Sequence, residues 1–579
     1  MKLIEALELV KRPAPEDAPP FKIFLGCGFT PLHLETFLDA HMRLLLPRAR
    51  VEIATGLYGD LAGSLEGLAP SGLEAVAVVI EWPDLDPRMG FRVLGGWRVS
   101  DVTDIVASAR KAASRMGAAI ERLAASVPVC VCFPTLPLPP LFVERPEKSG
   151  AHELELREIV ADLASSAGGA KRVRVASHQK LEEISPSRER HDIASDIATG
   201  FPWTLAHASR VAELMALLIG VPVPKKGLIT DLDDTLWAGV LGEVGVENLA
   251  WDLDRQAQPH GIYQQALASL ASSGILIGAA SKNDPGLVDK AFARPDLLLT
   301  REDIFPIEAH WDRKSGSVRH ILETWNIGPE SVVFVDDSPM ELAEVCSAFP
   351  EMECLLFPKG DPGAFLELLK HLRQVFGKSA VNEEDLIRLR SIRETTRFRE
   401  RSPDGPNAQD DFLREVAAKI LFKPDGRPDD ARALELVNKT NQFNLNGRRW
   451  TDAEWAAHFR EPNAFLLTAA YEDKFGPLGK IAVLLGRRDG SRLVLDAWVM
   501  SCRAFSRRIE HQCLKFLLEK TGAEEIVFGF APTSRNGPLR EFFRPWLSDL
   551  PPGPFSLATI NVLAKLPALF HDIAEAPDD

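Results

Sequence analysis

The stretch ITDLDDTLWAGVLGEVG, residues Ile229–Gly245, places three carboxylates within four positions directly after an apolar run. Like charges held this close repel one another unless a cation lies between them. Acidic residues are also common as turn formers and helix caps, so this motif alone does not decide between a turn and a site. The rest of the region has to supply the decision.

Two further apolar segments of the same region also end in polar residues. ILIGAA is followed by Ser281, Lys282 and Asn283, and SVVFV is followed by Asp336 and Asp337. Helical patterns, YQQALASLASSG and GSVRHILETWNI, separate these segments, and alternation of this kind is typical of a parallel α/β sheet. Because ligands bind at the carboxyl ends of such strands, we expect these polar groups to converge.

A set of converging carboxylates with a nearby lysine suits Mg²⁺-dependent phosphoryl chemistry. A hard divalent cation takes oxygen ligands, one carboxylate can attack phosphorus, and a second can pass a proton to the leaving oxygen. Lys314, in HWDRKSGSV, would neutralise the phosphoryl oxygens, and Ser281 would hydrogen-bond them. The sequence therefore predicts an Mg²⁺ site with an aspartyl-phosphate intermediate.

These motifs, DxDxT, then serine, then lysine, then an acidic pair, resemble the haloacid dehalogenase (HAD) superfamily of phosphotransferases. The resemblance implies that Asp231 is the nucleophile and Asp233 the general acid/base. It also implies that Asp231, the backbone carbonyl of Asp233 and Asp337 bind Mg²⁺, with Asp336 in support. The further expected substrate contacts are Thr235, Lys282 and Asn283.

The spacing of the motifs bears on how the site is covered. Asp231 and Ser281 are 50 positions apart, and Ser281 and Lys314 are 33 apart. Neither interval leaves room for a sizeable cap domain, so we expect an uncapped Rossmann-like domain with an open phosphoryl site. A large substrate or a neighbouring domain would then cover it.

Length, charge and composition limit the fold and the function of the whole chain. A chain of 579 residues with 45% apolar residues is too long for one core. The net charge of −15 argues against a general nucleic-acid binder, which relies on positive charge to neutralise phosphates. Seven cysteines without zinc-ligand spacing, no signal-peptide pattern and no apolar run of membrane-spanning length predict a soluble, cytoplasmic protein.

Three α/β-type domains are expected along the chain. Residues 1–224 alternate strands such as RVEIA and AVAVVIEW with helices, as in a flavodoxin-type α/β layer structure. Residues 225–378 hold the motifs described above. Residues 379–579 begin with a charged helix and linker and continue as meandering strands before a helix, RRIEHQCLKFLLEKTG, which indicates an α+β domain.

A closer resemblance, to FkbH-like proteins of the HAD superfamily, rests on DLDDTLWAGVLGEVG, SKNDP, VFVDDSP and LVNKTNQFNLNGRRW. It implies an SGNH-hydrolase-like first domain and a GNAT-like (acetyltransferase-like) last domain, the latter on DKFGPLGKIAV and MSCRAFSRRIEH. It further implies removal of phosphate from 1,3-bisphosphoglycerate and loading of a D-glyceryl unit onto the phosphopantetheine thiol of an acyl carrier protein. The alternatives are a plain HAD phosphatase acting on a sugar phosphate or polysaccharide precursor, and a non-catalytic carrier-binding scaffold.

An enzyme-bound glyceryl thioester would need a cysteine. Cys502 is the first candidate, because the nearby Arg503 and Arg507 would lower its pKa and could hold the phosphate of a carrier arm. It could equally be an ordinary buried residue. The segment RAFSRR lacks the glycines of a GNAT pyrophosphate loop, so binding of coenzyme A in the usual manner is not expected.

The polar segment NKTNQFNLNGRRW either contacts the acyl phosphate or carrier arm, or caps helices and bridges domains. Its candidate contact residues are Asn438, Lys439, Thr440, Asn441, Gln442, Asn444 and Arg448.

Two features of the first domain remain. Cys27, in FLGCGFT, occupies the region of an SGNH nucleophile; a structural turn is the favoured interpretation, and Cys27 is the second candidate thiol. The segment EWPDLDPRMGF is rich in prolines and acids and predicts a surface loop near the strand ends.

Overall fold

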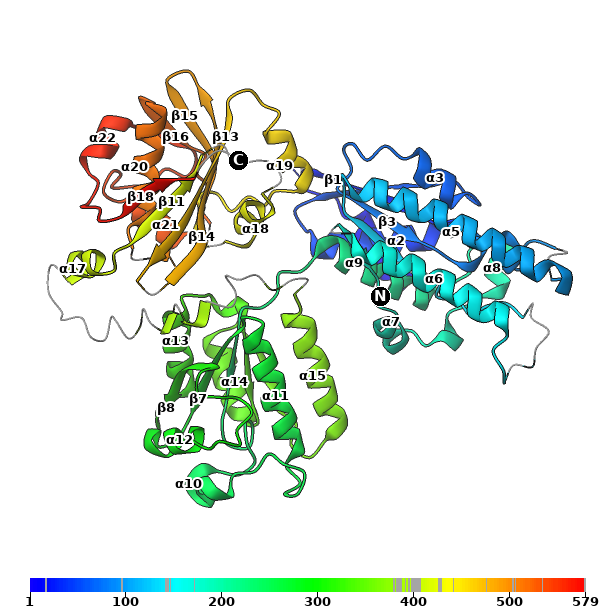
Figure 1. The fold of residues 1–579 in the computed structure, drawn as a ribbon, viewed down its shortest axis with the longest axis horizontal. Coiled ribbons are helices and arrows are strands. Elements are labelled where there is room, and N and C mark those ends of the chain that lie inside the picture. Colours follow the sequence, from blue (N-terminus) through cyan, green and yellow to red (C-terminus); the bar gives the residue numbers. More distant parts are fainter. Residues whose placement is uncertain are drawn as a thin grey trace. The chain divides into compact units, whose positions relative to one another are not determined.

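The computed structural model describes residues 1–579 except 16–17, 95–96, 141–144, 146, 171, 379–380, 382–387, 391, 394–395, 397–407, 425–429, 441, 475, 502–503, 506, 534 and 577–579. The chain separates into two compact units, Met1–Pro222 with Thr451–Glu454 and Val223–Trp450 with Trp455–Asp579. Within the described residues the strands form three sheets, and each is considered by itself (Figure 1). The division into three domains stays a prediction.

The first sheet is parallel throughout, with the order β2-β1-β3-β4-β5. Alternate residues of β1 face opposite layers: Phe24 packs with α3, α5 and α6, whereas Ile23 and Leu25 pack with α1, α2 and α9. The strands are β1 (Pro20–Gly26), β2 (Arg50–Thr55), β3 (Ala75–Val79), β4 (Val129–Cys132) and β5 (Val173–Val175). The helices are α1 (Leu3–Lys11), α2 (Leu32–Leu45), α3 (Leu61–Gly67), α4 (Trp82–Leu85), α5 (Val102–Ala124), α6 (Ala151–Gly169), α7 (His178–Ile184), α8 (Ile193–Thr199) and α9 (Leu205–Gly220).

The segment after β3 corrects one expectation. EWPDLDPRMGF was expected to form a surface loop, but it folds inward as α4 and a 3₁₀ turn, Pro87–Met89. Glu81 and Asp86 are only 1% and 2% exposed, and Trp82 and Met89 are also buried. The prediction was wrong because these buried acidic side chains have protein partners instead of water: Glu81 bonds to Thr135 and Trp203, which are distant in sequence, and Asp86 pairs with the nearby Arg88.

The second sheet is also parallel, with the order β10-β9-β6-β7-β8. The three apolar segments of the sequence are its central strands. The edge strands, β8 and β10, were not predicted from the sequence. The strands are β6 (Gly227–Thr230), β7 (Leu276–Ser281), β8 (Ile304–Ala309), β9 (Val332–Asp336) and β10 (Glu353–Leu356). The helices are α10 (Leu241–Val244), α11 (Gln258–Ser272), α12 (Pro285–Phe292), α13 (Lys314–Trp325), α14 (Pro339–Ala348) and α15 (Pro362–Phe376).

Helices cover both faces of the second sheet. Leu228 lies in a core formed with α11, α12 and α15, while its neighbour Ile229 lies in a core formed with α13 and α14. Glycine is needed where α13 crosses β7, because a Cβ on Gly278 would lie 2.8 Å from Cζ2 of Trp325. Between β6 and β7 the described chain forms only α10, a 3₁₀ turn and α11, so no cap with its own sheet is inserted there.

The third sheet is mixed, and its order is β17-β16-β15-β14-β13-β11-β18, with β12 paired to β15. Its centre is the antiparallel meander β13-β14-β15, whereas β16 and β18 run parallel to their neighbours β15 and β11. The strands are β11 (Lys419–Lys423), β12 (Phe443–Asn444), β13 (Ala464–Asp473), β14 (Gly476–Asp489), β15 (Arg492–Met500), β16 (Glu525–Phe528), β17 (Phe555–Ala558) and β18 (Asp572–Glu575). The helices are α17 (Ala408–Glu415), α18 (Ala431–Lys439), α19 (Asp452–His458), α20 (Ile509–Thr521), α21 (Gly537–Phe543) and α22 (Thr559–Ala564).

Across the described parts of the chain, every helix is too short or too polar to traverse a lipid bilayer. The cytoplasmic location stays a prediction.

Candidate active site

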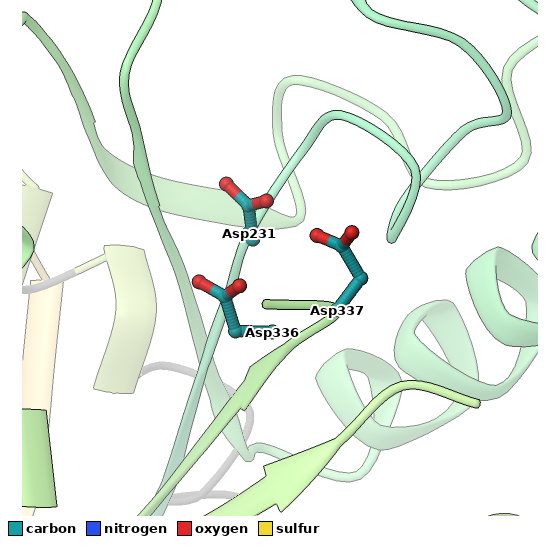
Figure 2. Close-up of side chains that lie close together, drawn as sticks. All are labelled: Asp231, Asp336 and Asp337. Carbon is teal, nitrogen blue, oxygen red and sulfur yellow. The ribbon is translucent and has the colours of Figure 1, made fainter. Parts of the chain in front are cut away.

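Three carboxylates meet at the carboxyl end of the second sheet. Asp231 directly follows β6, and Asp336 and Asp337 come at the end of the adjacent strand β9. Figure 2 shows the three side chains gathered in the same space, and one oxygen of each lies within 4.8 Å of the others. The sheet causes this meeting, because strands paired in parallel end at the same edge.

Lys314 lies among these carboxylates. It is the first residue of α13, and its Nζ is 2.9 Å from Asp231 Oδ1 and 2.6 Å from Asp336 Oδ2. Lys314, Asp231 and Asp336 are each at most 5% exposed. Nearly all water is therefore excluded from two carboxylates and one ammonium group, and the electrostatic interactions between them are strong.

Burial and the neighbouring charges shift the pKa values of these groups. Burial, with a contribution from Asp336, raises the pKa of Asp231 to about 7, although Lys314 opposes the rise. Burial also raises the pKa of Asp336, again against the effect of Lys314. For Lys314, burial acts to lower the pKa, but the two carboxylates outweigh it and the pKa is raised. The raised pKa values of both carboxylates indicate that Lys314 does not fully offset the cost of burying them, so a further cation would stabilise their charged forms.

The loop that follows Asp231 is shaped by its own polar contacts. Asp234 adopts the left-handed conformation, with φ of 53°, and its Oδ1 accepts a hydrogen bond from the backbone N–H of Gly239 at 2.7 Å. Trp237 Nε1 donates to Asp233 Oδ1 at 3.0 Å. Thr235 Oγ1 lies 3.4 Å from Asp337 Oδ1. The loop thus holds the side chain of Thr235 beside the carboxylate cluster, and Trp237 orients the side chain of Asp233.

Ser281, at the end of β7, is 3% exposed, and Asn283 Nδ2 donates to its Oγ at 3.0 Å. Lys282, in contrast, is engaged by α14, because its Nζ lies 2.8 Å from Glu341 Oε1. The predicted roles of Thr235, Lys282 and Asn283 as substrate contacts stay predictions.

Three residues near the cluster were missed in the sequence. Lys359 pairs with Asp337 and, at 2.8 Å, with Asp234 Oδ2. His260 Nδ1 lies 2.9 Å from the carbonyl of Thr235, and burial lowers the His260 pKa. The Tyr263 hydroxyl donates to Thr230 Oγ1 at 3.2 Å. Lys359 follows β10, so recognition of that edge strand would have indicated it as another polar residue at a strand end.

The donor set fits a hard divalent cation. Three carboxylates contribute oxygen atoms within one small space, and a fourth, Asp234, shares Lys359 with Asp337. Lys314 and Lys359 offset two of these four negative charges, so one divalent ion balances the remaining two. Mg²⁺ is commonly held by one or two carboxylates together with substrate phosphate. Asp231, Asp336 and Asp337 could therefore hold Mg²⁺; a contribution from the Asp233 carbonyl stays a prediction.

The amide-rich segment of the third sheet is used at least partly to shape the chain. Asn438 bonds both to the carbonyl and to the N–H of Trp450, at 2.7 and 2.8 Å. Asn444 is 2% exposed, donates to the Thr440 carbonyl and accepts from the N–H of Gly447. These contacts are what the bridging interpretation expects for Asn438 and Asn444.

Other members of that segment make contacts of different kinds. Lys439 pairs with Glu435 at 2.6 Å, and Arg448 stacks over the Trp450 ring at 4.0 Å. Gln442 is partly buried. Asn441 lies outside the described residues, and the proposed ligand contacts of the whole segment stay predictions.

The predicted thiol region of the third sheet is described only in part. Cys502 and Arg503 lie outside the described residues. Arg507 is 3% exposed and lies 3.4 Å from Asp473, which is also buried, and over the Tyr471 ring. Its guanidinium is therefore enclosed by the protein, and the predicted contact with a carrier arm stays a prediction.

Cys27, the second candidate thiol, is buried, and its Sγ lies 3.4 Å from the carbonyl of Phe29. Burial raises the pKa of this thiol, with a further contribution from Asp84. A thiol with a raised pKa is a poor nucleophile. The contacts of Cys27 therefore agree with its interpretation as part of a structural turn.

Comparison with known proteins bears on the fold. No protein-family model and no curated protein matches the chain significantly. Among solved structures, the N-terminal part of BF1531 from Bacteroides fragilis, containing a phosphatase domain complexed with Mg, is similar with a TM-score of 0.51 and 20% identity. The likeness covers 66% of this chain and 100% of that one.

A second solved structure is 3-deoxy-D-manno-octulosonate 8-phosphate phosphatase from Moraxella catarrhalis, with 17% identity over 26% of this chain and 87% of that one and a TM-score of 0.20. A likeness this low carries no argument. The likeness to BF1531 shows the fold alone: Rossmann-like parallel α/β sheets. Support for chemistry in this protein comes from the geometry of the site.

Proposed function

We propose that this protein is a Mg²⁺-dependent phosphoryl-transfer enzyme of the HAD type, with Asp231 as its nucleophile. The observation that carries the proposal is the meeting of oxygen atoms from Asp231, Asp336 and Asp337 within 4.8 Å, with Lys314 bonded to two of these residues. Burial of several charges in one place is costly unless a function or a compensating ion retains them.

The residues of the site divide the reaction into two steps. Asp231 attacks phosphorus, the bond from phosphorus to the leaving oxygen breaks, and Asp233 gives that oxygen its proton. A water molecule then passes a proton to Asp233 and attacks phosphorus, which releases phosphate and restores the Asp231 carboxylate. The hydrogen bond from Trp237 to Asp233 Oδ1 fixes the orientation of the acid/base group.

Charge on the phosphoryl oxygens has to be balanced during both steps. Bound Mg²⁺ supplies Lewis-acid stabilisation of that charge. Lys314 provides a fixed positive charge, and Ser281, oriented by Asn283, provides a hydrogen-bond donor. The Mg reported with the BF1531 phosphatase domain supports the choice of ion.

For the substrate we propose 1,3-bisphosphoglycerate, and for the acceptor the phosphopantetheine thiol of an acyl carrier protein. The FkbH-like motifs support this choice. The 3-phosphate is a stable monoester whose hydrolysis needs a catalyst such as the HAD site. The 1-phosphate is an acyl phosphate: a thiolate, at Cys502 or on the carrier, attacks the carbonyl carbon, phosphate leaves, and the glyceryl group remains as a thioester.

The test uses the full-length protein with Mg²⁺, 1,3-bisphosphoglycerate and a phosphopantetheinylated carrier protein. We expect phosphate release and a carrier mass raised by one glyceryl unit, both lost in Asp231→Asn. The control, Asp289→Asn, removes an equal charge from the exposed side of α12 and should retain activity.

Each alternative gives a different result in the same assay. Phosphate release without a change in carrier mass would leave the HAD chemistry in place and support a plain phosphatase, with sugar phosphates as the next substrates to assay. Carrier binding without any phosphate release from either class of substrate would support the scaffold and contradict the enzymatic proposal.

A further inference from the structure

The first unit contains a second candidate site that the phosphoryl chemistry does not use. A pocket of about 270 Å³ opens at the carboxyl ends of the first sheet. Its walls include Gly28 and Phe29, which follow β1, and residues of the segment 81–93, which follows β3. In the order β2-β1-β3-β4-β5, the chain reverses direction between β1 and β3, and ligands of open parallel sheets bind at such a switch point.

A buried hydrogen-bond network fixes the base of the pocket. Glu81 accepts hydrogen bonds from the backbone N–H groups of Thr135 and Leu136, from the Thr135 hydroxyl, and at 3.1 Å from Trp203 Nε1. Thr135 in turn contacts His207 Nε2 at 2.8 Å. Because Glu81 is satisfied by several donors, it anchors the loop and has little capacity left for a ligand.

Asp84 differs from Glu81 in its surroundings. Its carboxylate lies directly against the backbone of Gly28, where even a Cβ would come within 1.7 Å of Oδ1. Within the described residues its partners are backbone N–H groups, of Glu81 at 2.8 Å and of Gly28, and no cationic side chain pairs with it. Burial raises its pKa to about 7, and the nearby Glu81 adds to the rise. Asp84 is thus an acidic group that a cation would stabilise in its charged form.

The other charged side chains around the pocket are engaged elsewhere. His191 Nε2 lies 3.2 Å from Asp196 Oδ2, so the carboxylate of Asp196 already has an imidazole partner. Arg92, which is exposed, donates from Nη1 to the backbone carbonyls of Asp196 and Ile197 at 2.7 and 2.9 Å. Arg92 also lies over the Tyr58 ring, 5.9 Å from its centroid. Among the described carboxylates of the lining, Asp84 is therefore the one with neither an imidazole partner nor a side-chain hydrogen-bond donor.

Aromatic and apolar side chains make up most of the remaining wall. Phe29, Trp82, Met89 and Phe91 line the pocket, and Tyr58 lies at its edge with 57% of its surface exposed. The faces of aromatic rings attract cations, and apolar walls favour an apolar ligand body. The described lining contains no serine, threonine, cysteine or lysine side chain that could act as a covalent nucleophile.

We propose that this pocket binds a small organic amine, with the ammonium group on Asp84 and an apolar body between the aromatic walls. The chemistry of the walls selects this class: a carboxylate with only backbone N–H partners, aromatic side chains in the same lining, and a volume suited to a small molecule. The site is independent of the phosphoryl chemistry and would serve recognition of an amine.

The experiment is calorimetric titration of the full-length protein with 2-phenylethylamine and with its neutral analogue 2-phenylethanol. At pH 8 we expect the amine to bind at least about tenfold more tightly than the alcohol, as for a charge-assisted contact in a partly dry pocket. Affinity for the amine should fall between pH 8 and pH 6, because Asp84 becomes protonated.

Two variants separate this site from general charge effects. Asp84→Asn should lower affinity for the amine about tenfold while binding of the alcohol changes by less than about twofold, which also shows that the pocket is still formed. Asp162→Asn removes the same charge from the exposed face of α6 and should leave the affinity for both ligands unchanged.

A third variant tests the pocket independently in case Asp84→Asn does not fold. Phe91→Ala removes one aromatic side chain from the wall of the pocket and should weaken the binding of both ligands. The proposal is overturned if wild-type protein binds neither probe, if amine and alcohol bind equally, or if Asp84→Asn and Phe91→Ala both bind the amine like wild type.

Discussion

The Nζ atom of Lys314 lies 2.9 Å from Oδ1 of Asp231, and the two side chains are only 5% and 6% exposed. Lys314 belongs to α13 and Asp231 to the end of β6, so this ion pair joins a helix to the centre of the sheet. Removal of the Lys314 ammonium group would leave Asp231 and Asp336 facing each other almost without water.

Lys314→Met should therefore destabilise the second unit by about 3 kcal/mol in urea unfolding without divalent ions. The loss should be smaller in Mg²⁺, because a bound cation offsets the same repulsion. The double variant Asp231→Asn with Lys314→Met should be more stable than Lys314→Met alone, since one of the two carboxylates is then neutral. Equal stability of wild type and Lys314→Met would contradict the role of this pair.

Lys359→Met should tighten the binding of Mg²⁺ several-fold. Lys359 pairs with Asp337 and Asp234, and so competes with a metal ion for one of its expected ligands. Calorimetric titration with MgCl₂ measures the change. Lys290→Met, which removes an exposed charge from α12, is the control, and weaker Mg²⁺ binding by Lys359→Met would refute the competition.

The first unit should lose stability as the pH falls below about 6.5. Burial, with help from Arg190, lowers the pKa of His207 to about 3. Between these two values the unfolded chain binds a proton that the folded unit does not, so stability decreases by up to about 1.4 kcal/mol for each pH unit lost. Above pH 6.5 the contribution of His207 is fully present.

His207→Gln keeps hydrogen-bonding groups without a titrating imidazole and should flatten that pH dependence. Hydrogen-exchange mass spectrometry of peptides from β4, measured from pH 7.5 to pH 5 with correction for intrinsic exchange, reports the stability of this unit. His178→Gln, at the exposed start of α7, should retain the wild-type slope. An unchanged slope in His207→Gln would assign the pH dependence to other groups.

Gly278→Ala should destabilise the second sheet by about 1–3 kcal/mol, because the new Cβ would come within 2.8 Å of the Trp325 ring. Gly316→Ala is the matched control in α13, where nothing lies within 4 Å of the added Cβ. It should be neutral or stabilise by about 0.5–1 kcal/mol, through the loss of backbone freedom in the unfolded chain. Urea unfolding of both variants is the measurement, and equal midpoints would contradict the packing described.

The convergence of the second sheet's carboxylates could be predicted because parallel topology alone determines it. Once the segments before Asp231 and Asp336 are recognised as neighbouring parallel strands, their ends must meet. Lys359 could not be predicted in the same way. It follows β10, a short edge strand of four residues with no fully buried member, and such a strand lacks a clear apolar signal.

The surface-loop prediction for the segment after β3 was wrong for a different physical reason. The partners of Glu81 include Thr135 and Trp203, which lie 54 and 122 positions further along the chain. Local composition records the prolines and acids of the segment, but it contains no information on donors that only tertiary folding supplies. For this reason the pocket beside Asp84 also could not be inferred from the sequence.

The position of β18 at the edge of the third sheet has a consequence for folding during synthesis. β18 pairs with β11 in parallel, with Ile573 opposite Ile420, so this edge stays open until residues 572–575 have left the ribosome. A strand edge left open in a nascent chain is prone to pair with other chains. The strands of the first two sheets are all synthesised by Leu356, so these sheets can form while the third still waits for its last partner.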